Sequence, residues 1–420
     1  MNNQNIDRGH LQVMAFANTI GMPAINANVR ITERGEPEKI IEEIITDNSG
    51  QTPVITLPAP PVEFSLDPEN KLENRHHPYS EYDIHVTIEG FQTTTIEGVQ
   101  ILSNTTALQN VMLRPITQTA TSVTFTIPEH TLWGTFPPKT PEDEVKPLPE
   151  TTGLVVLPRP VIPEYIIVHA GIPTNAAAPN YWVPFKDYIK NVACCEIYST
   201  WPTAALEANI LAIISFTLNR IYTEWYRGKG FYNFTITNST AYDQAFVYQR
   251  NIFKEISTVV DYLFNTFITK PNIRQPLFTQ YCDGKMVSCP GWMTQWGSKS
   301  LGDQGYNSVG ILKSFYGSDI FLMNAQRVAG VPSSFPGYNL QMGSTGESVR
   351  TIQTQLNAIS NNYPAIHKLV VDGIFGNQTR MAVEIFQRIF QLPTSGIVDF
   401  PTWYKISNVY VAVTRMAELQ

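Results

Sequence analysis

One glutamate stands out among the side chains of this sequence that could do chemistry. Glu196 lies in an otherwise apolar stretch, just before a long apolar run. Burial there disfavours the charged form of a carboxyl group, and a general acid must hold a proton at neutral pH. Glu196 is therefore a candidate general acid. The alternative is a structural glutamate that pairs with Lys190 or caps the following helix.

The four cysteines offer a second kind of chemistry, because thiolates bind zinc. They occur as an adjacent pair, Cys194 and Cys195, and as a spaced pair, Cys282 and Cys289. A zinc site needs three or four nitrogen or sulfur ligands, and His169 is the plausible third ligand for the spaced pair. A disulfide or two ordinary buried thiols is the alternative there, while the adjacent pair is expected to fill a core. The main interpretation requires no cofactor, and zinc stays open.

The elements that must position Glu196 are predicted to be mainly helical. The run from Trp201 to Trp225 is apolar nearly all round, which is typical of a helix at the centre of a domain. Between Ile252 and Phe267 apolar residues recur at steps of three and four, which predicts a second helix. A strand is expected over residues 165–169. Residues 164–330 are therefore interpreted as one mixed, mainly helical domain that contains Glu196.

Residues 1–126 and 127–163 differ in kind from that domain. Apolar and polar residues alternate in the first region, as in Tyr82 to Ile88, and turn formers separate the runs, which predicts a β-sandwich. The pattern resembles carboxypeptidase-regulatory-like, or transthyretin-like, sandwiches, which are generally non-catalytic. Nine prolines fall in residues 127–163. Because proline lacks a backbone donor and restricts the preceding residue, this region is expected to be an extended, solvated and protease-accessible linker.

Length and composition exclude several classes of protein. A chain of 420 residues has room for about two to four domains of roughly 100 to 200 residues each. With 43% hydrophobic and 15% charged residues, it is neither a disordered chain nor a coiled coil. A formal net charge of -7 argues against a nucleic-acid partner, and no apolar run approaches the ~20 residues that cross a membrane. The first residues lack the pattern of a secretory signal. The expected fold class is multidomain α+β.

Three blocks of the sequence resemble the catalytic domain of stage II sporulation protein D. They are residues 183–209, which contain Glu196, residues 243–248 and residues 293–317. Members of that family are lytic transglycosylases that act on peptidoglycan, and the resemblance implies that Glu196 is the catalytic acid and then the base. The blocks also imply substrate contacts at Asp243, Gln244, Gln295, Trp296 and Tyr306. For Asp243, a structural role is the alternative. This chain has Ile214 where the family usually carries an arginine, so that contact must come from elsewhere.

The last part of the chain resembles the peptidoglycan-binding domain 1 family. The resemblance covers residues 339 to about 410 and includes two glycine-containing turns with acidic partners. It implies a small helical peptidoglycan-binding domain at residues 339–420. Asp372, Asn377 and Thr379 could bind a stem peptide, and a turn or capping role is the alternative that we favour.

The order of these regions resembles spore cortex-lytic enzymes of the SleC type. The resemblance implies that residues 1–126 are a pro-region and that a subtilisin-like protease activates the enzyme by a cut near the Leu154–Val155 bond. It also implies spore cortex peptidoglycan as the substrate and the cortex or coat region of the spore as the location. Two other hypotheses stay open, a non-catalytic protein that binds the spore wall and a zinc-dependent peptidoglycan amidase that uses His169 with cysteines.

Overall fold

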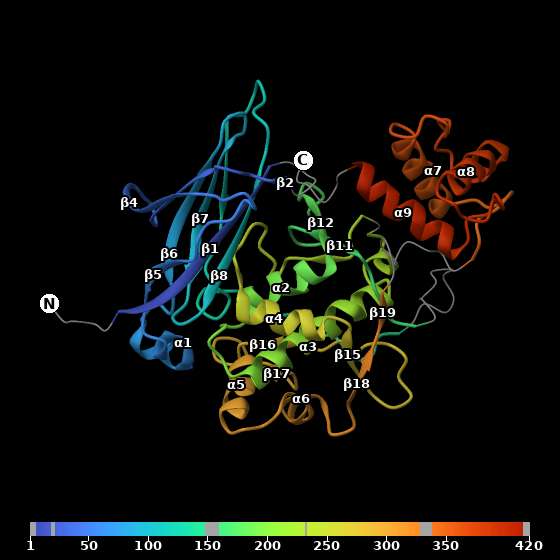
Figure 1. Cartoon of the computed structure of the whole chain (residues 1–420). Coiled ribbons are helices and arrows are strands. Elements are labelled where there is room, and N and C mark those ends of the chain that lie inside the picture. The colour runs from blue at the N-terminus through green and yellow to red at the C-terminus, as the bar shows by residue number, and fades with distance from the viewer. Residues whose placement is uncertain (1–5, 18–21, 148–158, 232, 328–337, 415–420) are drawn as a thin grey trace.

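A computed structural model gives the fold of the chain (Figure 1). It describes residues 6–17, 22–147, 159–231, 233–327 and 338–414. Within these ranges the N-terminal part is built mainly from strands, the middle part from helices with short strands, and the C-terminal part from helices. The expected cleavage bond, Leu154–Val155, lies outside the described residues.

Two five-stranded sheets make up most of the N-terminal part. The first has the order β14-β8-β1-β2, and β5 also pairs with β1. Its strands are β1 (Asp7–Ala17), β2 (Met22–Pro23), β5 (Ile55–Ala59), β8 (Thr106–Leu113) and β14 (Ile252–Phe253). The second has the order β4-β3-β6-β7-β9. Its strands are β3 (Asn28–Glu33), β4 (Glu36–Ile45), β6 (Ser80–Thr87), β7 (Thr93–Ile101) and β9 (Ser122–Thr126). A single turn of helix, α1 (Glu63–Leu66), and a short π-helix (Asn70–Asn74) follow β5.

Alternate side chains of these strands face a shared core. Leu11, Val13 and Ala15 of β1 are fully buried, as are Ile84 and Val86 of β6. Successive side chains of a strand point to opposite faces. The alternation of apolar and polar residues in the sequence therefore corresponds to one buried and one less buried face of each strand. Residues of both sheets belong to one apolar cluster, which also includes the core of the middle part.

One strand of the first sheet comes from the middle of the chain. β14 pairs antiparallel with β8, with Ile252 opposite Leu108. The neighbouring Asn251 is fully buried. Its Oδ1 accepts a hydrogen bond from the backbone N–H of Gln100 at 3.2 Å, and its Nδ2 donates to the carbonyl of Gln100 at 3.0 Å. A continuous sheet thus joins the N-terminal and middle parts, which the sequence pattern does not predict.

The middle part is arranged around one buried helix, α3. Its helices are α2 (Phe185–Glu196), α3 (Thr203–Tyr222), α4 (Lys254–Leu263), α5 (Gln295–Asp303), α6 (Ser308–Tyr316) and the 3-10 turn Arg227–Lys229. Its short strands are β10 (Val161–Ile162), β11 (Tyr165–His169), β12 (Asn180–Pro184), β13 (Ile236–Thr237), β15 (Thr266–Thr269), β16 (Tyr281–Cys282), β17 (Met293–Thr294), β18 (Phe321–Asn324) and β19 (Gln326–Arg327). Of the described helices, α3 alone is long and apolar enough to cross a membrane, but 89% of its apolar window is buried inside the protein. This agrees with the predicted central helix.

The second predicted helix of the middle part is shorter than expected. The helical segment α4 covers residues 254–263, whereas Ile252 lies in β14 and Phe267 lies in β15. Both ends of the predicted helix are strands because they pair with distant segments, β8 and β18. The apolar spacing is real, but long-range pairing decides the structure at its ends.

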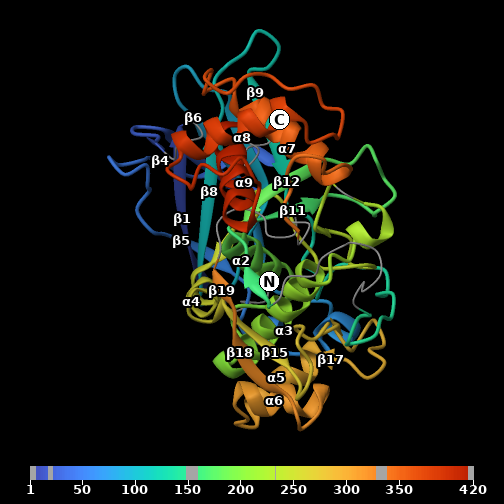
Figure 2. The same cartoon turned by 90° about the vertical axis from the view of Figure 1, so that its right-hand side faces the viewer.

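Three helices form the C-terminal part, α7 (Glu347–Ile359), α8 (Asn377–Ile389) and α9 (Phe400–Thr414). They have an apolar core of their own, which includes Phe375, Phe386 and Trp403. Both views place this part near β11 and β12 (Figures 1 and 2), where the rings of Trp182 and Tyr410 meet edge to face at 6.3 Å. The sequence predicts α7 and α8, but not α9.

Residues 128–147, here called the cover segment, lie partly buried against the middle part. The segment contains no helix or strand, yet His130, Leu132 and Lys146 are buried. It runs along the middle part and forms backbone hydrogen bonds with it, for example from the N–H of Thr140 to the carbonyl of Ala241 at 2.7 Å. The segment is therefore only partly solvated, because several of its side chains and backbone groups are held by the middle part while its prolines stay mostly exposed.

Candidate active site

Glu196 is the last residue of α2, and it is 4% exposed. Its Oε1 accepts a hydrogen bond from the backbone N–H of Ala245 at 3.0 Å, and its Oε2 accepts one from Nε2 of Gln295 at 3.1 Å. The hydroxyl of Thr131 also donates to Oε2, at 3.4 Å. Three distant segments therefore fix the orientation of this carboxyl group, and its predicted burial is confirmed.

The structural alternatives for Glu196 are not realised. The ammonium of Lys190 instead pairs with Asp261 at 3.0 Å. Helix α3 begins after Pro202 without a side-chain cap. The position of Glu196 therefore has no helix-capping or ion-pairing explanation of that kind.

The carboxyl group of Glu196 lines a small pocket that the cover segment closes. Residues of the cover segment that line it are Thr131, Gly134, Phe136, Pro137 and Lys139. The middle part contributes Glu196, Thr240, Cys282, Asp283, Met286, Val287 and Gln295. The cavity volume is about 50 Å³, whereas ligand pockets usually measure about 300–1,000 Å³. While the cover segment is in place, the pocket is therefore smaller than a typical ligand site.

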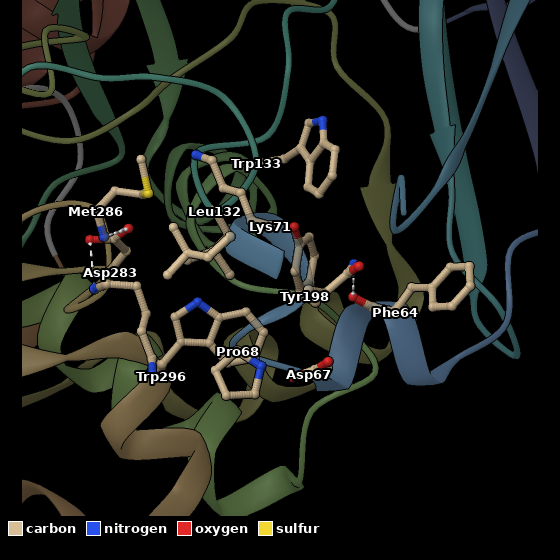
Figure 3. A pocket seen from close by; sticks show the side chains of 13 residues that line it. Phe64, Asp67, Pro68, Lys71, Leu132, Trp133, Tyr198, Asp283, Met286 and Trp296 are labelled. Carbon is tan, nitrogen blue, oxygen red and sulfur yellow. Dashed lines mark hydrogen bonds between the residues drawn. The ribbon is translucent and has the colours of Figure 1, made fainter. Parts of the chain in front are cut away.

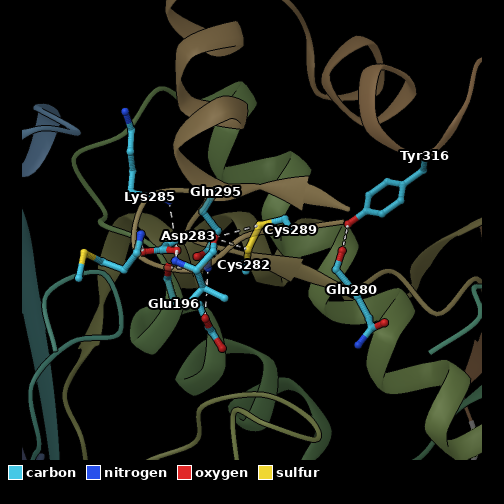
Figure 4. Close-up of a disulfide and its surroundings, with 10 residues drawn as sticks. Glu196, Gln280, Cys282, Asp283, Lys285, Cys289, Gln295 and Tyr316 are labelled. Atoms are coloured by element: carbon cyan, nitrogen blue, oxygen red, sulfur yellow. Dashed lines mark hydrogen bonds between the residues drawn. A yellow bond between two sulfur atoms is a disulfide. The ribbon is translucent and has the colours of Figure 1, made fainter. Parts of the chain in front are cut away.

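A disulfide closes the loop on one side of this pocket (Figure 4). Cys282 and Cys289 are bonded to each other, with a Cα–Cα distance of 5.7 Å. Inside the loop, the carboxylate of Asp283 accepts hydrogen bonds from two backbone N–H groups at 2.9 Å each. The loop is therefore locally restrained, and it places a second carboxylate, that of Asp283, along the same pocket as Glu196.

Of the two alternatives left open for Cys282 and Cys289, zinc binding and a disulfide, the structure contains the disulfide. Both sulfur atoms belong to the disulfide, so neither is a thiolate that could bind a metal. Nδ1 of His169 lies 2.8 Å from the amide oxygen of Asn180, and its Nε2 lies 3.2 Å from the carbonyl oxygen of Ile172. Within the described ranges, no group of three or more His, Cys, Asp or Glu could hold a metal ion.

The adjacent cysteines fill the core, as predicted. Cys194 and Cys195 are buried and carry no disulfide. Burial raises the pKa of the Cys194 thiol to about 12 and also raises that of Cys195. Because the thiolate is the nucleophilic form of cysteine, neither residue is suited to catalysis.

Two of the predicted substrate contacts are held inside the middle part. Asp243 is fully buried, accepts from Nε of Arg220 at 2.7 Å and accepts from the backbone N–H of Thr237 at 2.8 Å. Gln244 is also fully buried, and its Oε1 accepts from the hydroxyl of Thr217 at 2.8 Å. Neither side chain lines the pocket at Glu196, so the geometry favours the structural alternative for Asp243.

The other three predicted contacts lie in different surroundings. Nε2 of Gln295 donates to the carbonyl of Glu196 at 2.8 Å as well as to its carboxyl group, so Gln295 orients Glu196. Trp296 lines a second pocket, into which Lys71 of the N-terminal part also points (Figure 3). Tyr306 is 47% exposed and lines neither pocket. Of these three residues, only Gln295 touches Glu196.

Sequence analysis missed an arginine that holds the cover segment. The side chain of Arg220, in the last turn of α3, is fully buried. Its Nη1 and Nη2 donate to the two carboxylate oxygens of Glu142 at 3.0 and 2.7 Å. Burial alone would raise the pKa of Glu142, but Arg220 and Lys146 outweigh it and hold that pKa below its ordinary value of 4.5. An arginine inside an apolar helix is the signal that could have found this pair, because a buried guanidinium needs a partner.

Two lysines of the cover segment lie against aromatic rings of the middle part. Nζ of Lys139 is 4.9 Å from the ring centre of Tyr281. Nζ of Lys146 is 3.9 Å from the ring centre of Phe278 and 4.7 Å from that of Trp225. Burial lowers the pKa of Lys146 to about 8. These are cation–π contacts, which strengthen when water is excluded.

The three residues that could bind a stem peptide, or form a turn and cap as we favour, make contacts within the C-terminal part. Nε2 of Gln353 donates to Oδ1 of Asp372 at 2.8 Å and to the hydroxyl of Thr379 at 3.2 Å. Asp372 also accepts from the N–H of Ile374 at 2.8 Å, and these hydrogen bonds lower its pKa. Asn377 is the first residue of α8, which has no side-chain cap. The turn role is therefore realised by Asp372 and Thr379, but the capping role of Asn377 is not.

Comparison with known families defines the class of the C-terminal part. Residues 345–406 match the family model described as "Putative peptidoglycan binding domain". The match contains α7, α8 and the turn that begins at Asp372. The chain therefore carries a peptidoglycan-binding domain, as its sequence pattern predicts.

Comparison with solved structures gives short or distant likenesses. The structure of the SleB N-terminal domain is 30% identical over 17% of this chain and 93% of that chain, with a TM-score of 0.16. Catechol 1,2-dioxygenase from Acinetobacter sp. ADP1 is 17% identical over 29% of this chain and 56% of its own, with a TM-score of 0.19. The enzyme from Pseudomonas arvilla C-1 is 13% identical over 29% and 57%, also at 0.19. TM-scores this low carry no argument about the fold. No curated protein matches the chain.

Proposed function

We propose that this chain is a lytic transglycosylase that cleaves the glycan strands of peptidoglycan, with spore cortex as its substrate. The observation that carries the proposal is Glu196, a buried carboxyl group held by Ala245 and Gln295 beside a pocket. A carboxyl group that is buried and fixed in orientation is suited to proton transfer. The peptidoglycan-binding domain at residues 345–406 supports a substrate in the cell wall.

A single carboxyl group is sufficient for this reaction. Glu196 donates its proton to the glycosidic oxygen as the bond between that oxygen and C1 of the muramic acid residue breaks. The 6-hydroxyl oxygen of the same sugar then bonds to C1, and its proton passes to the carboxylate of Glu196. The product carries a 1,6-anhydro ring, no water is consumed, and Glu196 ends protonated as it began. Hydrolysis would instead use two carboxyl groups.

We further propose that the chain is made as a zymogen that a subtilisin-like protease activates by a cut near Leu154–Val155, in the spore cortex or coat region. The cover segment supports this proposal because it lines the pocket at Glu196 and contributes Thr131 to the hydrogen bonds of that carboxyl group. A cut after residue 147 would give the segment a free end. Activity should therefore appear only after the cut.

The test compares Glu196→Gln with the unchanged chain, each cut in residues 148–158 and added to purified cortex peptidoglycan. The substitution should lower the rate of solubilisation by about 10²–10⁴-fold, which is the usual contribution of general acid–base catalysis. Glu207→Gln, on the neighbouring helix α3, is the matched control and should keep full activity. Mass spectrometry should find muropeptides that are lighter by one water than the hydrolysed forms.

Other products would replace this proposal. Reducing ends, together with loss of activity in Asp283→Asn, would indicate a hydrolase that uses Asp283 as its second carboxyl group, since both residues line one pocket. Free stem peptides would indicate an amidase. Solubilisation that is equally absent from the unchanged chain and from Glu196→Gln would indicate a wall-binding protein without activity.

A further inference from the structure

We propose that the trench filled by residues 139–146 of the cover segment is a substrate subsite in which Arg220 binds a carboxylate of the peptidoglycan strand. By trench we mean the place that residues 139–146 occupy between their hydrogen-bond partners in residues 240–243 on one side and residues 275–280 on the other. In this arrangement Glu142 occupies the place of the substrate carboxylate. The inference rests on the proposed function for the chemistry of its ligand.

The first argument is the way in which the cover segment is bound. The N–H of Thr140 donates to the carbonyl of Ala241 at 2.7 Å on one wall. On the other wall, Nε2 of Gln280 donates to the carbonyl of Thr140 at 2.8 Å, and Oε1 of Gln280 accepts from the N–H of Glu142 at 2.8 Å. The segment is therefore bound as an extended ligand, through polar groups on both walls. Its departure would leave these groups available to another extended polymer.

The second argument is the geometry of Arg220. Asp243 holds Nε at 2.7 Å, and the carbonyl of Tyr242 accepts from Nη2 at 3.0 Å. Both terminal nitrogens point to Glu142 at 2.7 and 3.0 Å. Without Glu142, Asp243 would still orient the guanidinium, and its two terminal nitrogens would lack their carboxylate. A planar fork that is held in this way suits bidentate binding of another carboxylate.

The third argument is the aromatic surface beneath the two lysines. Lys139 lies over Tyr281, and Lys146 lies over Phe278 and Trp225. The C–H face of a sugar ring carries partial positive charge, as an ammonium group does, and the face of an aromatic ring attracts both. The subsite would therefore combine rings that pack against sugars with an arginine that binds an acidic group.

The ligand class follows from these three features. A peptidoglycan strand carries sugar rings. Its muramic acid residues supply carboxylates, from the stem peptide where one is attached or from the free lactyl group where none is. We therefore assign Arg220 to a stem-peptide or lactyl carboxylate and Trp225 to a sugar face. Glu196 lies at the other end of the cover segment's path, beside Thr131. A strand in the trench would thus reach the proposed acid.

The test measures binding by hydrogen exchange in the full chain with Glu196→Gln, so that no reaction occurs. The probe is a soluble peptidoglycan fragment with free stem-peptide carboxylates, and its carboxyl-amidated form is the comparison. Glu142→Gln should raise exchange in residues 137–147. The fragment should then protect residues 216–226 and bind there roughly tenfold or more tightly than in the chain with Glu142 intact.

The matched control is Glu144→Gln, which removes a carboxylate of the same segment that pairs with Lys270 at the surface. It should leave the trench closed. Protection of residues 345–406 should be the same in every variant, which shows that the probe binds. Trp225→Ala in the Glu142→Gln chain should abolish protection of the trench while the C-terminal protection remains.

Three results would overturn the subsite. They are protection of residues 345–406 alone in the Glu142→Gln chain, equal binding of the amidated fragment, and unchanged exchange in residues 137–147 in both Glu142→Gln and Glu142→Lys. Because binding is measured without catalysis, failure of the proposed reaction is a separate result. Binding in the trench without anhydro products would reject the transglycosylase and keep the subsite.

Discussion

A cut within residues 148–158 should leave the two fragments bound to each other. β14 remains paired with β8 across the cut, and Asn251 keeps both of its hydrogen bonds to the backbone of Gln100. Nη2 of Arg250 also donates to the side chain of Gln100 at 2.9 Å. These contacts are buried, so we expect the cut protein to migrate as one particle.

The substitution Asn251→Ala should weaken this association. It leaves the backbone N–H and C=O of Gln100 buried without partners, and each such group costs about 1–3 kcal/mol. Taking about 3 kcal/mol for the pair, the dissociation constant of the fragments should rise on the order of a hundredfold. Sedimentation velocity over a dilution series of the cut protein measures this change directly.

The control for this experiment is Asn28→Ala, which removes an exposed hydrogen bond to Glu43 within the N-terminal part. It should leave the dissociation constant unchanged. Separation of the unsubstituted fragments at micromolar concentration would refute the reasoning, because the buried contacts would then not hold the parts together. An unchanged dissociation constant in Asn251→Ala would refute it as well.

Two further predictions concern the acid and the cover segment. Gln295→Ala removes the amide that orients Glu196. The kcat on cortex peptidoglycan should therefore fall roughly tenfold to a hundredfold, while binding of the strand changes little. Equal changes in kcat and KM would contradict an orienting role. The pH dependence follows from Glu142, whose pKa is lowered by Arg220. A lowered carboxyl pKa stabilises docking above the ordinary value of 4.5, and this contribution is lost as the pH falls through the lower, docked value. The exchange rates of residues 137–147, each divided by the intrinsic amide rate at the same pH, should therefore rise on acidification below about pH 4.5. In Glu142→Gln this ratio should not respond. A flat ratio in the unsubstituted chain would contradict the ion pair.

Local patterns predicted the elements that depend on local sequence. The apolar run around Ile214 makes α3 a central helix, and the alternation around Ile84 makes β6 a strand. The burial of Glu196 follows from its apolar neighbours in the same way. These predictions hold because neighbouring residues alone decide which face is buried.

Two features that sequence analysis missed, β14 and the docking of the cover segment, depend on distant partners. β14 is two residues long, and only its pairing with β8 makes it a strand. The prolines and charges of the cover segment have the composition of a solvated linker, but Glu142 and Lys146 are partnered by residues far along the chain. A charged side chain usually indicates an exposed position. For Glu142 that indication fails, because its carboxylate pairs with Arg220. Composition cannot show such pairing.

The same contacts explain why a cut at residues 148–158 would matter although it breaks none of them. In the intact chain the cover segment is fixed at both ends, by Ile127, whose N–H donates to the carbonyl of Glu97, and by β10, which pairs with β19. After the cut its C-terminal end is free, so leaving the trench gains chain entropy that the intact loop does not gain. The cover segment can then leave the trench step by step, first at Glu142 and last at Thr131, while the N-terminal part stays bound. A peptidoglycan strand that supplies its own carboxylate to Arg220 would then compete with a cover segment that is attached at one end only. In the intact chain it would compete with a segment attached at both ends.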